Sequence, residues 1–202
     1  IGDREVDEDN MFIVLLSSFD VEGDVLTYTV DGGENISINL SGNELAFTPS
    51  QDFNGSESFT ITVSDGELQD SETFTVTVNA VNDAPVLASV SDVSFDEDNT
   101  GSTSLSGSDV DGDNLTYSIT GGSDITASLS GSDISFSAPL NYNGSEEFSV
   151  SVSDGEYTDS QLITVTVNAV NDAPELVAIG DREVNEDTSL NFLLSSSDID
   201  GD

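Results

Sequence analysis

The sequence predicts an all-β fold made of tandem seven-stranded β-sandwich modules with Greek-key connections. Three observations lead to this prediction: apolar and polar residues alternate at period two, the sequence repeats itself, and no window carries an apolar stripe of helical spacing. Residues 59–63 and 74–78 read Phe-Thr-Ile-Thr-Val and Phe-Thr-Val-Thr-Val. Such alternation places one face of a strand in a core and the other face in water.

The repeat has a period of 89 residues. Val81-Asn-Asp-Ala-Pro85 returns as Val170-Asn-Asp-Ala-Pro174, and no insertion interrupts the register. We therefore expect two full modules, residues 1–85 and 86–174, and the first strands of a third at 175–202. Because the chain begins with Ile and not with Met, we expect it to be an interior piece of a longer protein.

Each module is expected to hold seven short strands separated by turns that contain Gly, Asn or Asp. In the first module the alternation places them at residues 3–6, 11–16, 25–30, 36–40, 44–48, 58–64 and 72–80. About 89 residues in seven strands is the size of an immunoglobulin-like sandwich. Pro85 and Pro174 follow the last strand of each module, and because proline cannot continue a ladder, Asn-Asp-Ala-Pro is interpreted as a short, stiff joint.

The composition excludes several classes of function. The chain carries 41 Asp and Glu against 2 Arg and no Lys, a net charge of −39, so it repels nucleic acid phosphates and anionic membrane surfaces. It has no His and no Cys, which excludes a Ser-His-Asp triad, a thiol nucleophile, the usual zinc ligands and disulfides. High charge also favours disorder, but the period-two alternation argues against it.

The carboxylates gather in loops and at strand ends, as in Asp7-Glu-Asp9 and Asp109-Val-Asp-Gly-Asp113. Two carboxylates about 4 Å apart repel by roughly 4 kcal/mol at an effective dielectric near 20, so a cation is expected among them. Calcium fits because it takes six to eight oxygen ligands in irregular geometry. The alternative is that these are solvated loop acids. An EF-hand is excluded, because the glycine comes fourth and position twelve is Thr120.

These motifs together resemble cadherin repeats, in the variant of bacterial surface proteins and large adhesins. The similar segments are Phe95-Asp-Glu-Asp98, Asp109-Val-Asp-Gly-Asp113 with the following Tyr-Ser-Ile, Val152-Ser-Asp-Gly155 and the Asn-Asp-Ala-Pro joints. The chain departs from the family where Asp-Arg-Glu is replaced by Asp52-Phe-Asn54 and by Asn141-Tyr-Asn143.

The resemblance implies Ca²⁺ ions held jointly by neighbouring modules. At the first junction the implied ligands are Glu8, Asp52, Asn82, Asp83, Asp109, Asp111 and Asp154, with Asn54 as a further candidate. At the second junction they are Glu97, Asn141, Asn143, Asn171, Asp172, Asp198 and Asp200. The second site is expected to be the weaker one because Asn141 stands in the place of Asp52. At the opposite end of the first module, Asp20, Glu22 and Asp65 are expected to form an incomplete site.

These features predict a non-enzymatic, calcium-stiffened stalk or spacer of a large extracellular or cell-surface adhesin, whose partners are the neighbouring repeats of its own chain. One alternative is a calcium-dependent carbohydrate-binding module that contacts a surface glycan, although only Phe53, Tyr142 and Tyr157 are loop aromatics. Another is a filament made by head-to-tail strand exchange, because residues 179–202 nearly copy 1–24. Paired-carboxylate catalysis is disfavoured, because the acids recur in every copy.

Overall fold

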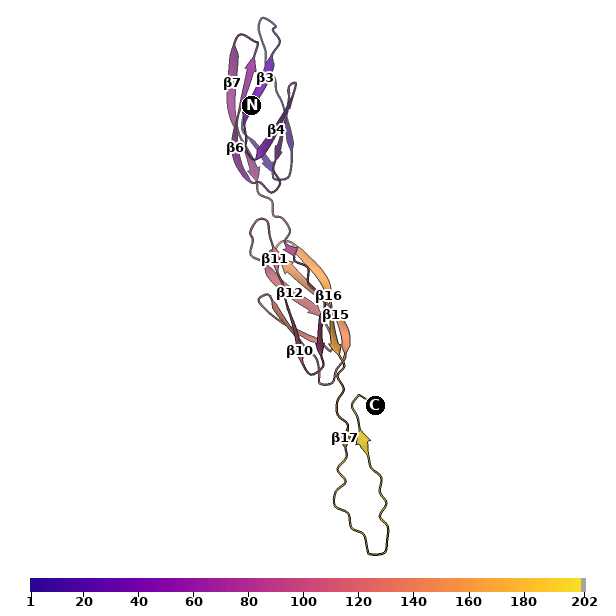
Figure 1. Ribbon diagram of the computed structural model, residues 1–202. Coiled ribbons are helices and arrows are strands. Elements are labelled where there is room, and N and C mark those ends of the chain that lie inside the picture. The colour runs from indigo at the N-terminus through magenta and orange to yellow at the C-terminus, as the bar shows by residue number, and fades with distance from the viewer. Residues whose placement is uncertain (201–202) are drawn as a thin grey trace. The chain divides into compact units, whose positions relative to one another are not determined.

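The computed structural model describes residues 1–200 and divides the chain into two compact units, Ile1–Asp83 and Ala84–Asp202 (Figure 1). The last two residues of the second unit, 201 and 202, lie outside the described part. Within residues 1–200 every regular element is a strand, which confirms the all-β prediction. No helix in this part is long and apolar enough to cross a membrane.

The first unit contains the seven expected strands in two sheets. They are β1 (Arg4–Asp7), β2 (Phe12–Leu15), β3 (Thr27–Gly32), β4 (Ile36–Ser41), β5 (Glu44–Pro49), β6 (Gly55–Ser64) and β7 (Gln69–Asn79). One sheet has the order β1-β7-β6-β3 and the other the order β2-β5-β4. Only the β1–β7 pair is parallel; the other pairs of this unit are antiparallel.

The second unit repeats this arrangement and adds two short strand pairs. The repeated strands are β9 (Val93–Asp96), β10 (Thr100–Ser104), β12 (Thr116–Gly121), β13 (Thr126–Ser130), β14 (Asp133–Ser137), β15 (Gly144–Ser153) and β16 (Thr158–Asn168). Their sheets have the orders β12-β15-β16-β9 and β10-β14-β13. The added pairs are β8 (Val86–Leu87) with β11 (Gly107–Ser108), and β17 (Glu175–Leu176) with β18 (Ser196–Ser197).

The start of the third repeat differs from the sequence prediction. Residues 178–195 form no strands, although their equivalents in the first repeat form β1 and β2. In the first repeat β1 pairs with β7 and β2 with β5, and neither partner has a counterpart among the described residues of the third repeat. A strand without a partner leaves its backbone groups to water, so these residues lie extended and exposed.

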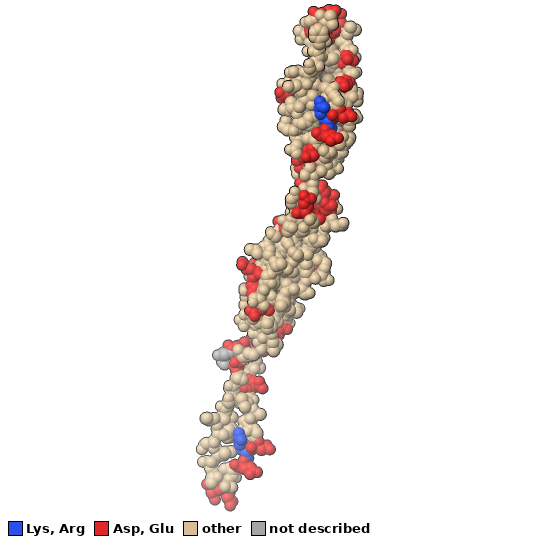
Figure 2. All heavy atoms as spheres, turned by 180° about the vertical axis from the view of Figure 1, so that it is seen from behind, with Lys and Arg blue, Asp and Glu red and all other residues tan. Residues whose placement is uncertain are grey.

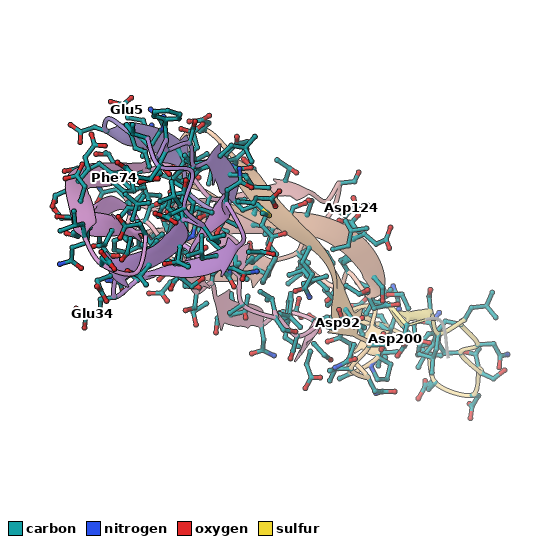
Figure 3. All side chains as sticks on the ribbon, turned by 90° about the horizontal axis from the view of Figure 1, so that it is seen from above. Glu5, Glu34, Phe74, Asp92, Asp124 and Asp200 are labelled. Carbon is teal, nitrogen blue, oxygen red and sulfur yellow. The ribbon has the colours of Figure 1, made fainter. Side chains whose placement is uncertain are left out.

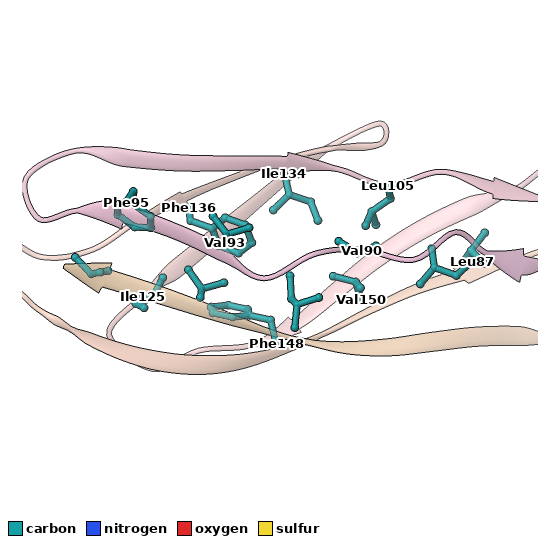
Figure 4. Close-up of a cluster of buried hydrophobic side chains, with 14 residues drawn as sticks. Leu87, Val90, Val93, Phe95, Leu105, Ile125, Ile134, Phe136, Phe148 and Val150 are labelled. Atoms are coloured by element: carbon teal, nitrogen blue, oxygen red, sulfur yellow. The ribbon is translucent and has the colours of Figure 1, made fainter.

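Each unit has its own core between its two sheets. In the first unit the rings of Phe47, Phe59 and Phe74 meet at centroid distances of 5.1 to 5.8 Å, mostly edge to face. Figure 3 shows Phe74 among the strands, while Glu5 and Glu34 lie at the perimeter. In the second unit Phe136 and Phe148 make the equivalent contact at 5.3 Å (Figure 4).

In each unit a glutamate side chain holds the turn that connects one sheet to the other. In the second unit the Glu146 carboxylate on β15 accepts the backbone amides of Ser123, Asp124 and Ile125 at 2.8 to 3.0 Å, in the turn between β12 and β13. These amides, that of Asp124 first, hold the pKa of Glu146 below its ordinary value. Glu57 accepts the equivalent amides of residues 34–36 in the first unit.

Because the folded-state pKa of Glu146 is lowered, its contribution to stability is present above the unfolded pKa of about 4.5 and is lost as pH falls through the folded value. We therefore expect Glu146→Gln to lower the melting temperature at pH 7, with a difference from wild type that shrinks steadily below about pH 4.5. Thermal unfolding from pH 7 to 3 measures this. Glu147→Gln, an exposed neighbour, is the control. A difference that stays constant with pH would contradict the assignment.

Candidate metal sites

The acidic side chains lie in separate clusters, with wide neutral surfaces between them (Figure 2). The fold accounts for one kind of cluster directly. Because β1 runs parallel to β7, the residue after β1 lies beside the residues after β7, where the Asn-Asp joint begins. The same relation holds between β9 and β16 in the second unit. The carboxylates of two distant sequence motifs therefore meet at one end of the sandwich.

Glu8 is the best-buried of these acids in the first unit. Its side chain is 3% exposed, and its Oε1 accepts the Val81 amide at 2.5 Å. Its Oε2 is buried and has no hydrogen-bond partner in the described chain. In the second unit Glu97 is likewise buried, with 4% exposure, and its Oε1 accepts the Val170 amide at 2.5 Å. A buried carboxylate oxygen without a donor is costly unless a cation or a proton accompanies it.

Three carboxylates come together at the end of the first unit where the Asn-Asp joint begins. Asp9, Asp52 and Asp83 each offer an oxygen, and these oxygens lie within 4.8 Å of one another. Asp9 and Asp52 both have positive φ, 60° and 56°, and the Asp9 Oδ1 accepts the Asp52 amide at 3.1 Å. Asp52 and Asp83 are among the ligands predicted from the sequence, whereas Asp9 is not. The sequence signal for Asp9 was its place directly after Glu8, in a turn where one residue must adopt a left-handed backbone conformation.

The Asp109-Val-Asp-Gly-Asp113 loop of the second unit brings three carboxylates within 4.8 Å of one another. Asp109 organises the loop, because its Oδ1 accepts the amides of Asp111 and Asp113 at 3.0 and 3.2 Å. Its Oδ2 is buried without a hydrogen-bond partner in the described chain. Asp109 and Asp111 are among the ligands predicted from the sequence, and the structure adds Asp113 to the group.

The second junction lies inside the second unit, around Asp172. The Asp172 amide donates to Asp200 Oδ2 at 2.6 Å, and Asp172 lines an open hollow together with Asp98, Asn141 and Asp198. Burial raises the pKa of Asp172, and the negative charges of Asp200, Asp98, Glu97 and Asp198 raise it further. Three predicted ligands, Glu97, Asp198 and Asp200, are thus close enough to a fourth, Asp172, for their charges to act on it. Asp98, the equivalent of Asp9, was missed.

Other predicted ligands hold local turns. Asp65 Oδ1 accepts the Leu68 and Glu67 amides, which lower the pKa of this carboxyl, and Asp154 Oδ1 accepts the Glu156 and Tyr157 amides. Asp20 Oδ1 accepts the Gly23 and Asp24 amides.

Asn82 and Asn171 donate to the carbonyl of the next residue, at 3.2 and 2.8 Å. Glu22 and Asn143 are exposed, and among residues 1–200 no group of three acids includes Asp20, Glu22 or Asp65. The predicted meeting of the first-unit ligands with Asp109, Asp111 and Asp154 stays a prediction, because these residues belong to different units.

Comparison with known proteins identifies the modules. A model of the bacterial Ig domain matches residues 2–79 and again residues 82–166. The chain belongs to the bacterial Ig domain family. Each match covers most of one full repeat, and the β-sandwich of each unit is the fold expected of this family.

Two similar proteins extend this comparison. Chitinase A of Pseudoalteromonas piscicida is 35% identical over 103 residues, which is 49% of this chain but only 13% of that protein. The structure of Drosophila N-cadherin EC1-4 is 18% identical, with a TM-score of 0.54 over 84% of this chain and 48% of that one. The cadherin likeness is one of fold and agrees with the predicted cadherin-like repeat. The chain thus spans a small part of the curated relative and about half of the cadherin structure.

The negative charges around Asp172 lead to a prediction that can be tested without a bound metal ion. In chelator, Asp172→Asn removes one of several mutually repelling charges while keeping the backbone donor to Asp200. We expect slower hydrogen exchange at the Val177 amide, which bonds to the Ser195 carbonyl and closes the β17–β18 pair. Asp181→Asn, an exposed acid of the same segment, is the control and should leave the rate unchanged. Equal rates in wild type and Asp172→Asn would contradict the repulsion.

Proposed function

We propose that these modules form an extracellular stalk or spacer of an adhesin-type protein, in which Ca²⁺ ions bind at the module junctions and stiffen them. The observation that carries this proposal is the buried Glu8, whose Oε2 has no hydrogen-bond donor among residues 1–200 and whose carboxylate lies within 4.8 Å of that of Asp83. Hard oxygen ligands without His or Cys favour Ca²⁺ over a transition metal.

The residues present fit a calcium ion chemically. Glu8, Asp9, Asp52 and Asp83 supply carboxylates at the end of the first unit, and Asp172 with Asp98, Asp198 and Asp200 does so at the second junction. Calcium accepts carboxylates and carbonyls in irregular arrangements, which suits ligands drawn from turns and a joint. When bound, the ion neutralises the repulsion among these carboxylates, so the junction becomes ordered.

The mechanical role follows from where the acids lie. Further acids lie on strands, but the groups whose carboxylates come within 4.8 Å of one another belong to turns, loops and the Asn-Asp joint. An ion that takes ligands from two modules restricts the joint between them, whereas like charges without an ion push the modules apart. Extracellular calcium modules bind at about 10⁻⁴ to 10⁻³ M, so the proposed stiffening belongs to an extracellular or surface location.

The carbohydrate-binding alternative loses support from the placement of its aromatics. Phe53 and Tyr142 are half-buried, and their rings lie directly against Gly55 and Gly144. Two of the three loop aromatics that the sequence offers therefore anchor turns, and the exposed rings Tyr157, Phe19 and Phe192 lie in three separate segments and are not equivalent positions of the repeat. Sugar platforms rely on exposed aromatic faces, so the stalk is the better-supported function. We propose no catalytic role for these modules.

The variant Glu8→Gln tests the calcium site, because we expect its effect on the melting temperature to be opposite in chelator and in Ca²⁺. Gln keeps an oxygen for the Val81 amide but removes a buried charge, so in chelator we expect a melting temperature above that of wild type. In millimolar Ca²⁺ we expect the reverse, because the variant loses part of the stabilisation that binding supplies, about 1.4 kcal/mol at ten times Kd.

Differential scanning calorimetry of the full chain in EDTA and in 5 mM-range Ca²⁺, roughly ten times the Kd expected for such modules, makes the comparison. Glu5→Gln, an exposed acid on β1, changes the net charge equally and is the control. If Glu8→Gln shifts the melting temperature in the same direction with and without calcium, the proposed ligand role is wrong.

Stiffening itself is measured by small-angle X-ray scattering. In wild type we expect Ca²⁺ to narrow the range of maximum dimensions that the chain adopts. The double variant Asp109→Asn with Asp111→Asn should lose most of this response. Asp124→Asn with Asp133→Asn removes the same charge from exposed positions of the second unit and should respond like wild type. Scattering curves of wild type that are identical in chelator and in calcium would remove the mechanical role.

A further inference from the structure

Strand β2 of the first unit exposes apolar side chains along one edge of its sheet. Phe12 and Val14 pack into the core of the unit. Met11, Ile13 and Leu15 alternate with them on the outer face and are 56%, 51% and 69% exposed. β2 is an edge strand of the sheet β2-β5-β4. We call Met11, Ile13 and Leu15 the β2 stripe.

The backbone of β2 offers hydrogen-bonding groups at the same edge. The Leu16 amide donates to the Asn43 carbonyl at 2.7 Å, next to the antiparallel pair of β2 with β5. Because the direction of the backbone groups alternates along an antiparallel strand, those of Ile13 and Leu15 point away from β5. Among residues 1–200 no strand other than β5 pairs with β2. The edge can therefore accept a further strand.

The second unit shows that this edge stays open when a segment precedes the module. There β8 pairs with β11, which lies beyond the end of β10, the equivalent of β2. Within the described part of the chain β10 itself pairs only with β14. Residues that precede the first unit in the same way would pair with residues 18–19 and leave residues 11–15 open. The open edge is therefore a property of the module.

The apolar character of the stripe is not required by the sandwich. The second unit has Thr100, Ser102 and Ser104 at the equivalent positions, and its strand β10 takes the same place in the same sheet. Edge strands are commonly protected from pairing by charged residues or by proline. Residues 10–19 contain neither. In a chain with a net charge of −39, two copies can therefore approach along β2 without bringing charged side chains of this strand together.

The β2 stripe is complementary to itself. In an antiparallel pair of two β2 strands centred on Ile13, this residue faces its own copy, and Met11 faces Leu15 of the second copy. No other antiparallel register gives all three side chains of the stripe an apolar neighbour from the stripe of the second copy. The residues whose backbone groups point to the open edge are the ones that carry the stripe, so the same register pairs the backbones. Glu44 on β5 lies on the side of Leu15 away from the second copy.

We propose that β2 of the first unit pairs antiparallel with β2 of a second copy of this chain. The two three-stranded sheets then join into one sheet with the order β4-β5-β2-β2-β5-β4. Ile13 packs against its own copy at the centre, and Met11 and Leu15 pack against each other on both sides of it. A second copy is the occupant that this edge fits, because the stripe and the backbone groups match each other under a two-fold axis.

The interaction is independent of the calcium proposal and of strand exchange. It uses no proposed calcium ligand, so it does not rest on the proposed function. It leaves β1 and β2 in their own molecule, whereas strand exchange would replace them. We expect a weak association, with a Kd on the order of 10⁻⁵ to 10⁻³ M, because pairing over five residues buries less surface than a stable interface does.

Sedimentation equilibrium of the full chain, at concentrations up to the millimolar range and in enough salt to screen its negative charge, tests the proposal. We expect the average mass to rise toward that of a dimer, and Ile13→Lys to abolish the rise, because it places two like charges directly opposite each other. Leu68→Lys is the matched control, because Leu68 is an equally apolar, 76% exposed residue of the same unit outside β2. A strict monomer, or association that survives Ile13→Lys, overturns the proposal.

Disulfide crosslinking tests the register, and the chain has no cysteine of its own to interfere. In the proposed pair the Cα atoms of the two Ile13 residues are about 5.5 Å apart, within the range of a disulfide. The two Leu15 residues are four positions out of register, about 13 Å apart along the strands.

We therefore expect Ile13→Cys to form a covalent dimer at least about tenfold faster than Leu15→Cys, which is the matched control in the same strand. Equal rates for the two variants would show that the pair is not antiparallel and centred on Ile13. An Ile13→Cys rate no higher than that of Leu68→Cys would show that the β2 strands do not meet. Either result overturns the proposal.

Discussion

The structure depends on how a chain with 41 carboxylates and two guanidinium groups places its negative charge. Most of the acids are in water, where repulsion is screened. Glu8 and Glu97 are not: each is almost fully buried, and each is tied through one oxygen to the amide that begins the joint. Their burial is the feature that most requires a counter-charge, since a buried unpaired carboxylate opposes folding.

The sandwich explains why these glutamates reach the joint. A parallel pairing between the first and last strands of a module brings their carboxyl ends together, so an acid after the first strand contacts the backbone after the last. The left-handed turn at Asp9 and Asp98 then directs a second carboxylate to the same end, where it binds the amide of residue 52 or 141. The meeting of these carboxylates at one end of each sandwich is therefore a consequence of one strand pairing.

The sequence predicts the repeated sandwich well, because period-two alternation at Phe59–Val63 and Phe74–Val78 reports directly on burial. It places the start of β6 three residues late, since residues 55–57 extend the ladder to β7 without an apolar signal. Asp9 and Asp98 were missed because their role comes from backbone geometry, which the residue type alone does not report. The short pair β8–β11 was missed because two residues carry no periodicity.

A cation bound by Glu8 and its neighbours would be visible in a crystal structure of the chain grown in abundant Ca²⁺, with anomalous scattering to identify the ion. We expect an ion about 2.3 to 2.6 Å from Glu8 Oε2 and from an Asp83 oxygen. Density for water alone at that position, in crystals saturated with calcium, would contradict it.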